Sequence, residues 1–488
     1  MAAEAAPEQQ QAEAEEYDFE GAFQRLAGAK CRVERILLVG LERTKQELVE
    51  AELRRLKHGC TLEEIRDAAM AAHDELMALD VFDAIDLVLT EGSKGADTCT
   101  VVARFREKGM LRLHAGTYVQ GTEGSVQTSL NLTNPLGHAE QVSLGAEYGS
   151  QATNIYTLAV TKPKPFGAAL LADVRLHQLG HNYQPWSSYA ELLRGGQVTL
   201  SSEDGRHAVS YELGWRRLTD PGRTASRAVL GQLGDKLLSA VKYVHRGETF
   251  DSATFPTQVE CCSRADGSYG YRAETQVAGL GAPNPSLLRY VRQHLQGKAA
   301  FRLADGAALT LSAEAGLLLP WGAGGLAGAT PISDRFFLGG TGVGALRGFA
   351  QKGVGPSDAR RPVAEAGSSS GGEATHPLGR RDALGGDLFC SLMAALNFQL
   401  PAESLRSVGI HGHVFVNGGS LVQGAGPGRS LQSAWHEFAT SFRWSVGAGI
   451  VWPTRIGKLE LNLCQVLARQ PFDQPRVGLQ FGFVPPAW

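Results

Sequence analysis

The chain has 488 residues and a net charge of −3, with 43% hydrophobic and 20% charged residues. This composition excludes an intrinsically disordered chain, which is poorer in apolar residues, and a nucleic-acid-binding protein with a strong basic excess. Seven cysteines without a repeated spacing exclude a disulfide scaffold and argue against a zinc site. The 59 glycines indicate many turns and strands.

The first 30 residues form an acidic segment. They contain seven acidic residues and two basic ones, Arg25 and Lys30. A secretory signal needs a basic start followed by an apolar run, and a mitochondrial presequence is rich in arginine and poor in acids. The segment fits neither pattern. We therefore interpret 1–30 as an acidic disordered tail and expect any targeting signal elsewhere in the chain.

Residues 31–107 carry the pattern of one small α/β domain. A short apolar strand is expected at 32–39. Two hydroxyl–glutamate pairs, Thr44 with Glu47 and Thr61 with Glu64, have the spacing of helix capping boxes. The second of these helices follows an amphipathic pattern to about Leu79. Two strands then complete a predicted order of strand, helix, helix, strand, strand.

From Gly109 onward, apolar and polar residues alternate with a period of two, as at 111–119 and 142–148. A soluble sheet and a membrane barrel both give this alternation, because each has one apolar face. The strand length, the extent of the pattern and aromatic residues near strand ends favour the barrel. The expected fold is an all-β transmembrane barrel of about 16 antiparallel strands at 108–488, preceded by the small α/β domain.

One connection of the predicted barrel, residues 320–387, is long and lacks this alternation. Its second part, 357–386, is a low-complexity segment that we expect to be disordered. Its first part carries apolar anchors and several glycines between Ile332 and Phe349. Long loops with anchors of their own are commonly functional, so this part is the candidate site.

The candidate loop resembles the signature loop of the outer-membrane-protein assembly superfamily, the BamA-like barrels. Two motifs carry this resemblance: Asp334, Arg335, Phe336, Phe337, Leu338, Gly339 and Gly340, and then Leu346, Arg347, Gly348 and Phe349. The domain at 31–107 resembles a single POTRA domain in element order and size. The sequences at 107–109 and 131–137 most resemble the mitochondrial branch, which serves the sorting and assembly machinery (SAM complex).

In this superfamily the long loop folds back into the barrel. The resemblance implies that Arg347 points into the wall and donates a charge-assisted hydrogen bond, with Gly348 allowing close approach and Phe349 packing beside it. The usual partner is an aspartate in a Phe-x-Asp-Gly sequence, and the matching residue here is Asn417. The resemblance thus makes Asn417 the candidate loop-pinning partner. Because an asparagine accepts hydrogen bonds without carrying charge, the expected pairing is either weaker than in the family or supplied by another acid.

The C-terminal strand resembles a mitochondrial β-signal, whose pattern is polar-x-Gly-x-x-hydrophobic-x-hydrophobic. Arg476, Gly478, Phe481 and Phe483 match this pattern. The two phenylalanines lie two residues apart and are expected on the lipid face. We expect the last strand to meet the first strand, which carries Leu111 and Leu113, at a short and weakly paired lateral seam.

The resemblance implies insertion and assembly of β-barrel precursors into the mitochondrial outer membrane through this seam. The implied partners are β-barrel precursor polypeptides, accessory subunits of a sorting and assembly complex, and membrane lipid. The POTRA-like domain is expected in the intermembrane space. One alternative is a plastid outer-envelope barrel of the same superfamily, acting in import or assembly. The other is a soluble β-rich binding protein or enzyme.

No motif indicates catalysis or a cofactor. The glycine run at 339–344 lacks the Gly-Lys-Ser/Thr ending of a phosphate-binding loop. His411 and His413 have no nearby acid or cysteine at metal-ligand spacing, so we expect a polar pair that faces the lumen. We therefore expect neither an enzyme nor a protein that binds a metal, a nucleotide, a nucleic acid or another cofactor.

Overall fold

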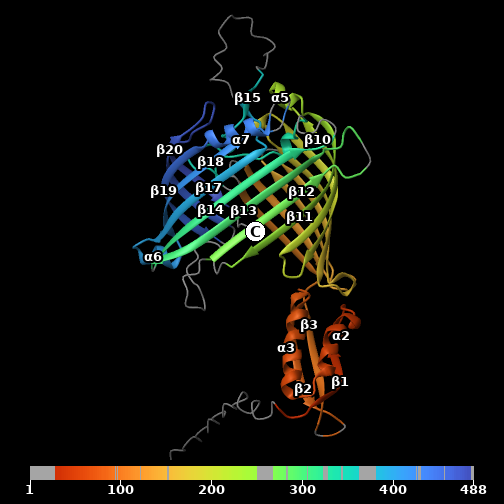
Figure 1. Ribbon diagram of the computed structural model, residues 1–488. Coiled ribbons are helices and arrows are strands. Elements are labelled where there is room, and N and C mark those ends of the chain that lie inside the picture. Colours follow the sequence, from red (N-terminus) through yellow and green to blue (C-terminus); the bar gives the residue numbers. More distant parts are fainter. Residues whose placement is uncertain are drawn as a thin grey trace, which may run out of the picture. The chain divides into compact units, whose positions relative to one another are not determined.

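The computed structural model describes residues 28–484, except for residues 94, 96, 121–122, 151–152, 250–267, 282–283, 305, 323–327, 342–344, 362–380, 425, 427–429 and 455–456. Most of the predicted acidic tail and of the predicted low-complexity segment therefore lies outside the described residues. The chain divides into two compact units (Figure 1). The first extends to Arg112 and includes Leu132–Gln141, and the second contains the remainder. The predicted domain limits, 31–107 and 108–488, stay a prediction.

The N-terminal unit is a three-stranded sheet with two helices packed on one face (Figure 1). Its elements follow the predicted order: β1 (Arg32–Val39), α2 (Gln46–Leu53), the short 3₁₀ helix η1 (Arg54–His58), α3 (Leu62–Ala78), β2 (Phe82–Glu91) and β3 (Thr98–Glu107). The central strand β3 pairs in parallel with β1 and antiparallel with β2. The core is aliphatic and aromatic, and its fully buried side chains include Leu53, Ile65, Leu76 and Phe82.

One of the two predicted helix caps is present, and the other is wrong. The hydroxyl of Thr61 accepts a hydrogen bond from the amide of Glu64 at the start of α3, as predicted, whereas the Glu64 carboxylate accepts from the amide of Cys60 rather than from that of Thr61. Helix α2 instead follows Lys45, whose side chain makes no capping bond. Thr44 is buried, and its hydroxyl accepts a hydrogen bond from Nδ2 of Asn134 at 2.8 Å. The Thr44 hydroxyl, which local spacing assigned to a helix cap, therefore binds a residue that is distant in sequence.

Glu107 fixes the segment that joins β1 to α2. Its carboxylate accepts hydrogen bonds from the amides of Glu42, Arg43 and Thr44 at 3.2, 3.2 and 2.8 Å, and Nε of Arg43 lies at 3.1 Å. Burial raises the pKa of Glu107, but the hydrogen bonds from Thr44 and Arg43 outweigh it, so the pKa lies below its ordinary value. The ionised carboxylate is thus the form that holds the segment.

We predict that Glu107→Gln destabilises the N-terminal unit by about 1–3 kcal/mol, because an amide offers only one acceptor oxygen to these donors. A group whose pKa falls on folding stabilises the folded state above its unfolded pKa, and this stabilisation is lost as the pH falls through the folded pKa. The difference from the wild type should therefore be complete at pH 7 and should shrink only as the pH falls below the unfolded pKa of about 4.3 toward the lower folded pKa.

Hydrogen-exchange protection of β1 and β3 in the full chain, measured at pH 7 and at a series of pH values below about 4.3, tests this prediction. Glu50→Gln, in the same region but at an exposed position of α2, is the matched control. Equal protection of Glu107→Gln and wild type at pH 7 would contradict the role of this carboxylate.

The second unit is one antiparallel sheet of 16 strands that curves into a barrel (Figure 1). Its strands are β4 (Leu111–Gln120), β5 (Glu123–Thr133), β6 (Gln141–Gly149), β7 (Asn154–Pro163), β8 (Leu170–Asn182), β9 (Ala190–Ser202), β10 (His207–Thr219), β11 (Gly234–Glu248), β12 (Ser268–Ala278), β13 (Tyr290–Ala304), β14 (Ala307–Pro320), β17 (Leu388–Gln399), β18 (His411–Val422), β19 (Arg443–Thr454), β20 (Gly457–Ala468) and β21 (Gly478–Val484). Each strand pairs with its neighbour in sequence order, with β14 next to β17. The predicted 16-strand barrel is confirmed.

Apolar side chains cover the outside of this barrel, and polar side chains line the inside. On β20, for example, Leu461 and Leu463 are 42% and 61% exposed, whereas Glu460 and Asn462 between them are buried. The same alternation leaves Val414 and Val416 of β18 exposed and His413 and Asn417 buried. An apolar outer face with a polar interior is the pattern of a barrel in lipid. Among the described residues, no helix has the length and apolar character needed to cross a membrane.

Candidate functional site

The connection between β14 and β17, which we call the in-folding loop (320–387), is closed at its base by Arg335. The guanidinium of this buried residue donates to Oγ1 and the carbonyl oxygen of Thr330, at 2.8 and 3.0 Å, and to the carbonyl oxygen of Leu384 at 3.1 Å. Its Nε lies 3.7 Å from Oδ1 of Asp387. Arg335 therefore joins the beginning and the end of the loop.

Asp334, the neighbouring motif residue, attaches the loop to β9 and β10. Its Oδ2 lies 2.6 Å from Nη1 of Arg216 on β10. Nε of the same guanidinium lies 2.9 Å from Oε1 of Glu191 on β9. All three side chains are at most 10% exposed. A buried guanidinium between two carboxylates has a fixed position, and so does the loop segment bound to it.

Arg347 attaches the second motif to the C-terminal strands. Its Nε and Nη2 donate to Oε2 and Oε1 of Glu460 on β20, at 2.9 and 2.8 Å. This is a buried two-point ion pair, with both side chains at most 7% exposed. The predicted direct pairing with Asn417 is therefore wrong, and the alternative of another acid holds. Asn417 instead donates from Nδ2 to the carbonyl oxygen of Arg347 at 3.4 Å.

Gly348 and Phe349 bring the loop against the last strand. The amide of Gly348 donates to Oε1 of Gln480 on β21 at 2.9 Å, and its carbonyl oxygen accepts from the amide of Arg476 at 2.7 Å. Gly348 has a φ of +91°, and a Cβ there would lie 3.0 Å from Cβ of Ser445. Glycine is therefore required both for the backbone conformation and for the close approach.

Main-chain pairing continues on both sides of the buried Phe349. Phe349 forms a β-bridge with Pro475, and the amide of Ala350 donates to the carbonyl oxygen of Gln474 at 2.9 Å. The amide of Gln474 in turn donates to the carbonyl oxygen of Gly353 at 2.8 Å. The loop therefore runs beside the segment that leads into β21.

The remaining motif residues lie within the fold of the loop. Gly340 and the fully buried Leu346 form a bridge across the loop, and Gly339 lies close to the backbone of Ala350. The structure thus places the eight predicted site residues of the two motifs in one loop: Asp334, Arg335, Gly339, Gly340, Leu346, Arg347, Gly348 and Phe349.

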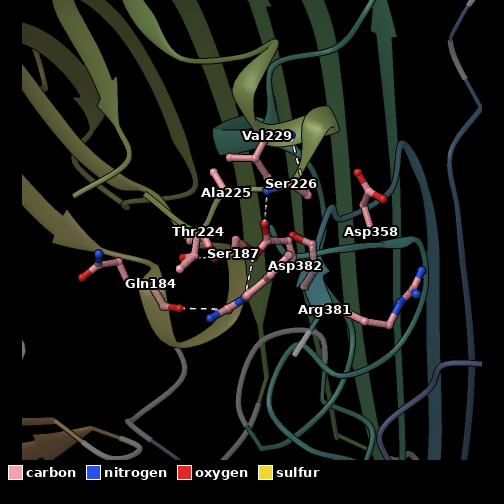
Figure 2. Close-up of polar contacts among 12 residues, drawn as sticks. Gln184, Ser187, Thr224, Ala225, Ser226, Val229, Asp358, Arg381 and Asp382 are labelled. Carbon is pink, nitrogen blue, oxygen red and sulfur yellow. Dashed lines mark hydrogen bonds and ion pairs between the residues drawn. The ribbon is translucent and has the colours of Figure 1, made fainter. Parts of the chain in front are cut away.

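The outer part of the loop forms a small hairpin, β15 (Ser357–Ala359) with β16 (Arg381–Ala383), that packs on neighbouring connections. The expected disorder of 357–386 is therefore wrong for the two described ends of that segment, because they pair with each other and bury Asp382. Figure 2 shows Asp382 pointing toward Ser226, which lies in the β10–β11 connection. The amide of Ser226 donates to Oδ2 of Asp382 at 2.8 Å. The hydroxyl of Ser187 donates to the carbonyl oxygen of Ala383 at 2.6 Å. This hairpin therefore holds the loop a second time, at the β8–β9 and β10–β11 connections.

The predicted seam residues lie on or beside the two strands that end the sheet order, β4 and β21. Leu111 and Leu113 are exposed on β4. On β21, Phe481 is exposed and pairs with Leu461, and Phe483 pairs with Leu459. Gly478 begins β21, and Arg476 precedes it. The placement on two edge strands fits the prediction, whereas a seam that opens stays a prediction.

The sequence interpretation missed several residues that hold the loop, among them Glu460, Arg216 and Gln480. A signal for Glu460 was present, because it lies between Leu459 and Leu461 in an alternating strand and so had to face the lumen. The described residues contain no group of three or more His, Cys, Asp and Glu side chains that could hold a metal ion. His413, one of the two histidines considered in the sequence, is buried, and its Nε2 lies 2.5 Å from Oδ1 of Asn462 on β20.

We predict that Glu460→Gln releases the Arg347 segment, because removing one partner of a buried ion pair leaves the other charge uncompensated, at a cost of about 3–5 kcal/mol. Hydrogen exchange of the peptide 345–356 should accelerate in the variant. Glu403→Gln, at an exposed position of the short helix α6 (Glu403–Ser407), is the control. Exchange equal to that of the wild type would show that Glu460 does not hold the loop.

This chain is similar to known proteins both in sequence and in fold. Residues 134–483 match the Omp85 superfamily domain. The chain is 28% identical over 460 residues to the Sorting and assembly machinery component 50 homolog of Mus musculus, covering 92% of this chain and 89% of the mouse protein. It is 28% identical over 434 residues to a SAM50-like protein of Schizosaccharomyces pombe, covering 86% and 82% of the two chains.

Among solved structures, BamA from Haemophilus ducreyi lacking POTRA domains 1–3 is similar, with a TM-score of 0.72 and 15% identity, over 93% of this chain and 84% of that one. This likeness supports the fold. The superfamily match covers more than half of the chain, and it agrees with the 16-strand barrel and the loop motifs. Because proteins of this family are non-enzymatic assembly machinery, the expectation that the chain is not an enzyme is confirmed. The chain belongs to the Omp85 superfamily.

Proposed function

We propose that this protein inserts and assembles β-barrel precursor polypeptides in the mitochondrial outer membrane, as the barrel subunit of a sorting and assembly complex. The observation that carries this proposal is the similarity along 92% of the chain to proteins that are named as sorting and assembly machinery components. The proposal includes accessory subunits and membrane lipid as partners. It also assigns the N-terminal unit to the intermembrane space, where it receives precursors or couples their release.

The proposed route for a precursor is the seam between β4 and β21. These strands end the sheet order, and the described part of β21 has seven residues, whereas β19 and β20 have twelve each. A short strand offers few backbone hydrogen bonds across a seam, so the seam opens at a low cost. Its exposed edge then pairs with an incoming strand by β-augmentation.

The membrane itself supplies the driving force. An unpaired N–H or C=O group in hydrocarbon costs several kcal/mol, so a precursor strand gains by pairing each backbone group with the open edge. In this proposal the protein needs neither a nucleotide nor covalent chemistry, because pairing of successive strands carries the precursor into the bilayer.

Insertion of a labelled β-barrel precursor into mitochondria depleted of this protein tests the proposed function. We expect insertion to fall with depletion and to return when the wild-type chain is restored, while import of a matrix-targeted protein stays unchanged. Full insertion after depletion would contradict the proposal. Fractionation of organelles provides a separate test, and recovery of the chain in plastid envelopes would favour the plastid alternative.

We predict that a disulfide across the seam blocks insertion. One cysteine is placed in β4 and one in β21, and pairs that form a crosslink on oxidation are retained. Insertion should stop in the oxidised protein and recover after reduction, because a locked edge cannot pair with a precursor. Cysteines at Ile450 and Leu461, which are directly paired on β19 and β20, form the matched control away from the seam. Normal insertion through a locked seam would contradict the lateral route.

A further inference from the structure

Lys352 occupies an aromatic cage in the in-folding loop. Its Nζ lies 4.5 Å from the ring centroid of Tyr183, 4.9 Å from that of Trp186 and 4.6 Å from that of Phe337. An ammonium within about 6 Å of an aromatic face is attracted to the negative charge of that face, and the attraction increases when water is excluded. Three rings around one ammonium make this an anchor rather than an incidental contact.

Two of the three rings belong to the barrel, not to the loop. Tyr183 and Trp186 lie in the connection between β8 and β9, and Trp186 is part of the short helix α4 (Gln184–Ser187). The ring of Tyr183 packs against that of the buried Tyr189, with a centroid distance of 4.9 Å. This packing fixes the ring of Tyr183, which contacts the ammonium of Lys352.

The cage and the Arg347 ion pair attach neighbouring residues to separate parts of the barrel wall. Arg347 binds Glu460 on β20, whereas Lys352, five residues later, binds the connection that leads into β9. Eight strands lie between β20 and β9 in the sheet order: β19, β18, β17, β14, β13, β12, β11 and β10. The segment 347–352 therefore links two distant parts of the sheet across the lumen.

The same segment carries the main-chain bonds to the end of the chain. Gly348, Ala350 and Gly353 exchange backbone hydrogen bonds with 474–476, and the amide of Gly348 binds Gln480 of β21. Lys352 lies between Ala350 and Gly353 and has a φ of +55°, so its backbone completes the turn that presents these groups. Lys352 therefore lies within the segment that pairs with 474–476, immediately before β21.

We propose that Lys352 is a positioning residue that braces the in-folding loop between the β8–β9 connection and β20, and so holds the segment 348–353 against the start of β21. This inference rests on the proposed function, because it assigns the brace to the seam strand. The cation is the required feature. Arginine keeps the attraction to the rings, whereas methionine keeps a similar length without the charge.

The test uses the full chain in detergent with Lys352→Met, Lys352→Arg and the control Lys57→Met, which removes an exposed lysine of the N-terminal unit. Hydrogen exchange is followed in the peptides 346–356 and 470–480, which contain the paired amides of Ala350, Val354, Gln474 and Arg476. We expect exchange in both peptides to accelerate about tenfold in Lys352→Met. Lys352→Arg should restore protection, and Lys57→Met should leave it unchanged.

Precursor insertion is measured in parallel with the same variants. We expect Lys352→Met to reduce the insertion rate several-fold and Lys352→Arg to restore it. Unchanged exchange in Lys352→Met overturns the proposal, as does equal loss of protection in Lys352→Arg, because a general packing defect then explains the result. Unchanged insertion despite faster exchange also overturns it. If the wild-type chain itself inserts no precursor, the proposed function fails, whereas the exchange data still decide whether Lys352 positions the loop.

Discussion

The pairing of backbone groups is the constraint on which this structure depends. A strand that crosses hydrocarbon has no water to satisfy its N–H and C=O groups, so each strand needs a partner on both sides. Fourteen of the sixteen strands have two ladder neighbours, and only β21 and β4 end the order. Both the rigidity of the wall and the proposed reactivity of the seam follow from this arrangement, because within the described part of the 16-stranded sheet the strands without a second ladder neighbour are those at the seam.

The in-folding loop is attached to the inside of the barrel through buried polar contacts. Three of its anchors are buried charged groups: Asp334 with Arg216, Arg335 with Asp387, and Arg347 with Glu460. Buried ion pairs add little to net stability, because desolvation offsets the attraction, but a broken pair is costly. These pairs therefore specify one position for the loop. They also hold the glycine-rich segment beside 474–476, with which it exchanges backbone hydrogen bonds.

Period-two alternation predicted strands from Gly109 onward, whereas strand length and aromatic residues near strand ends favoured the barrel over a soluble sheet, and the extent of the pattern gave the strand number. The motif 334–349 predicted the loop. The partner of Arg347 was not predictable by analogy, because the acid lies on β20 while the expected position on β18 carries Asn417. Thr44 was assigned to a helix cap for a similar reason, since local spacing contains no information about the distant Asn134. Sequence patterns thus identified the elements, whereas the pairings between elements required the structure.

The central claim is that the apolar face of this sheet lies in lipid. Alkaline carbonate extraction of the membranes that contain the full chain tests this claim most directly, because it removes peripheral proteins and leaves integral ones in the bilayer. The account predicts that the chain stays in the membrane pellet after extraction. Recovery of folded chain in the carbonate supernatant, without detergent, would contradict it.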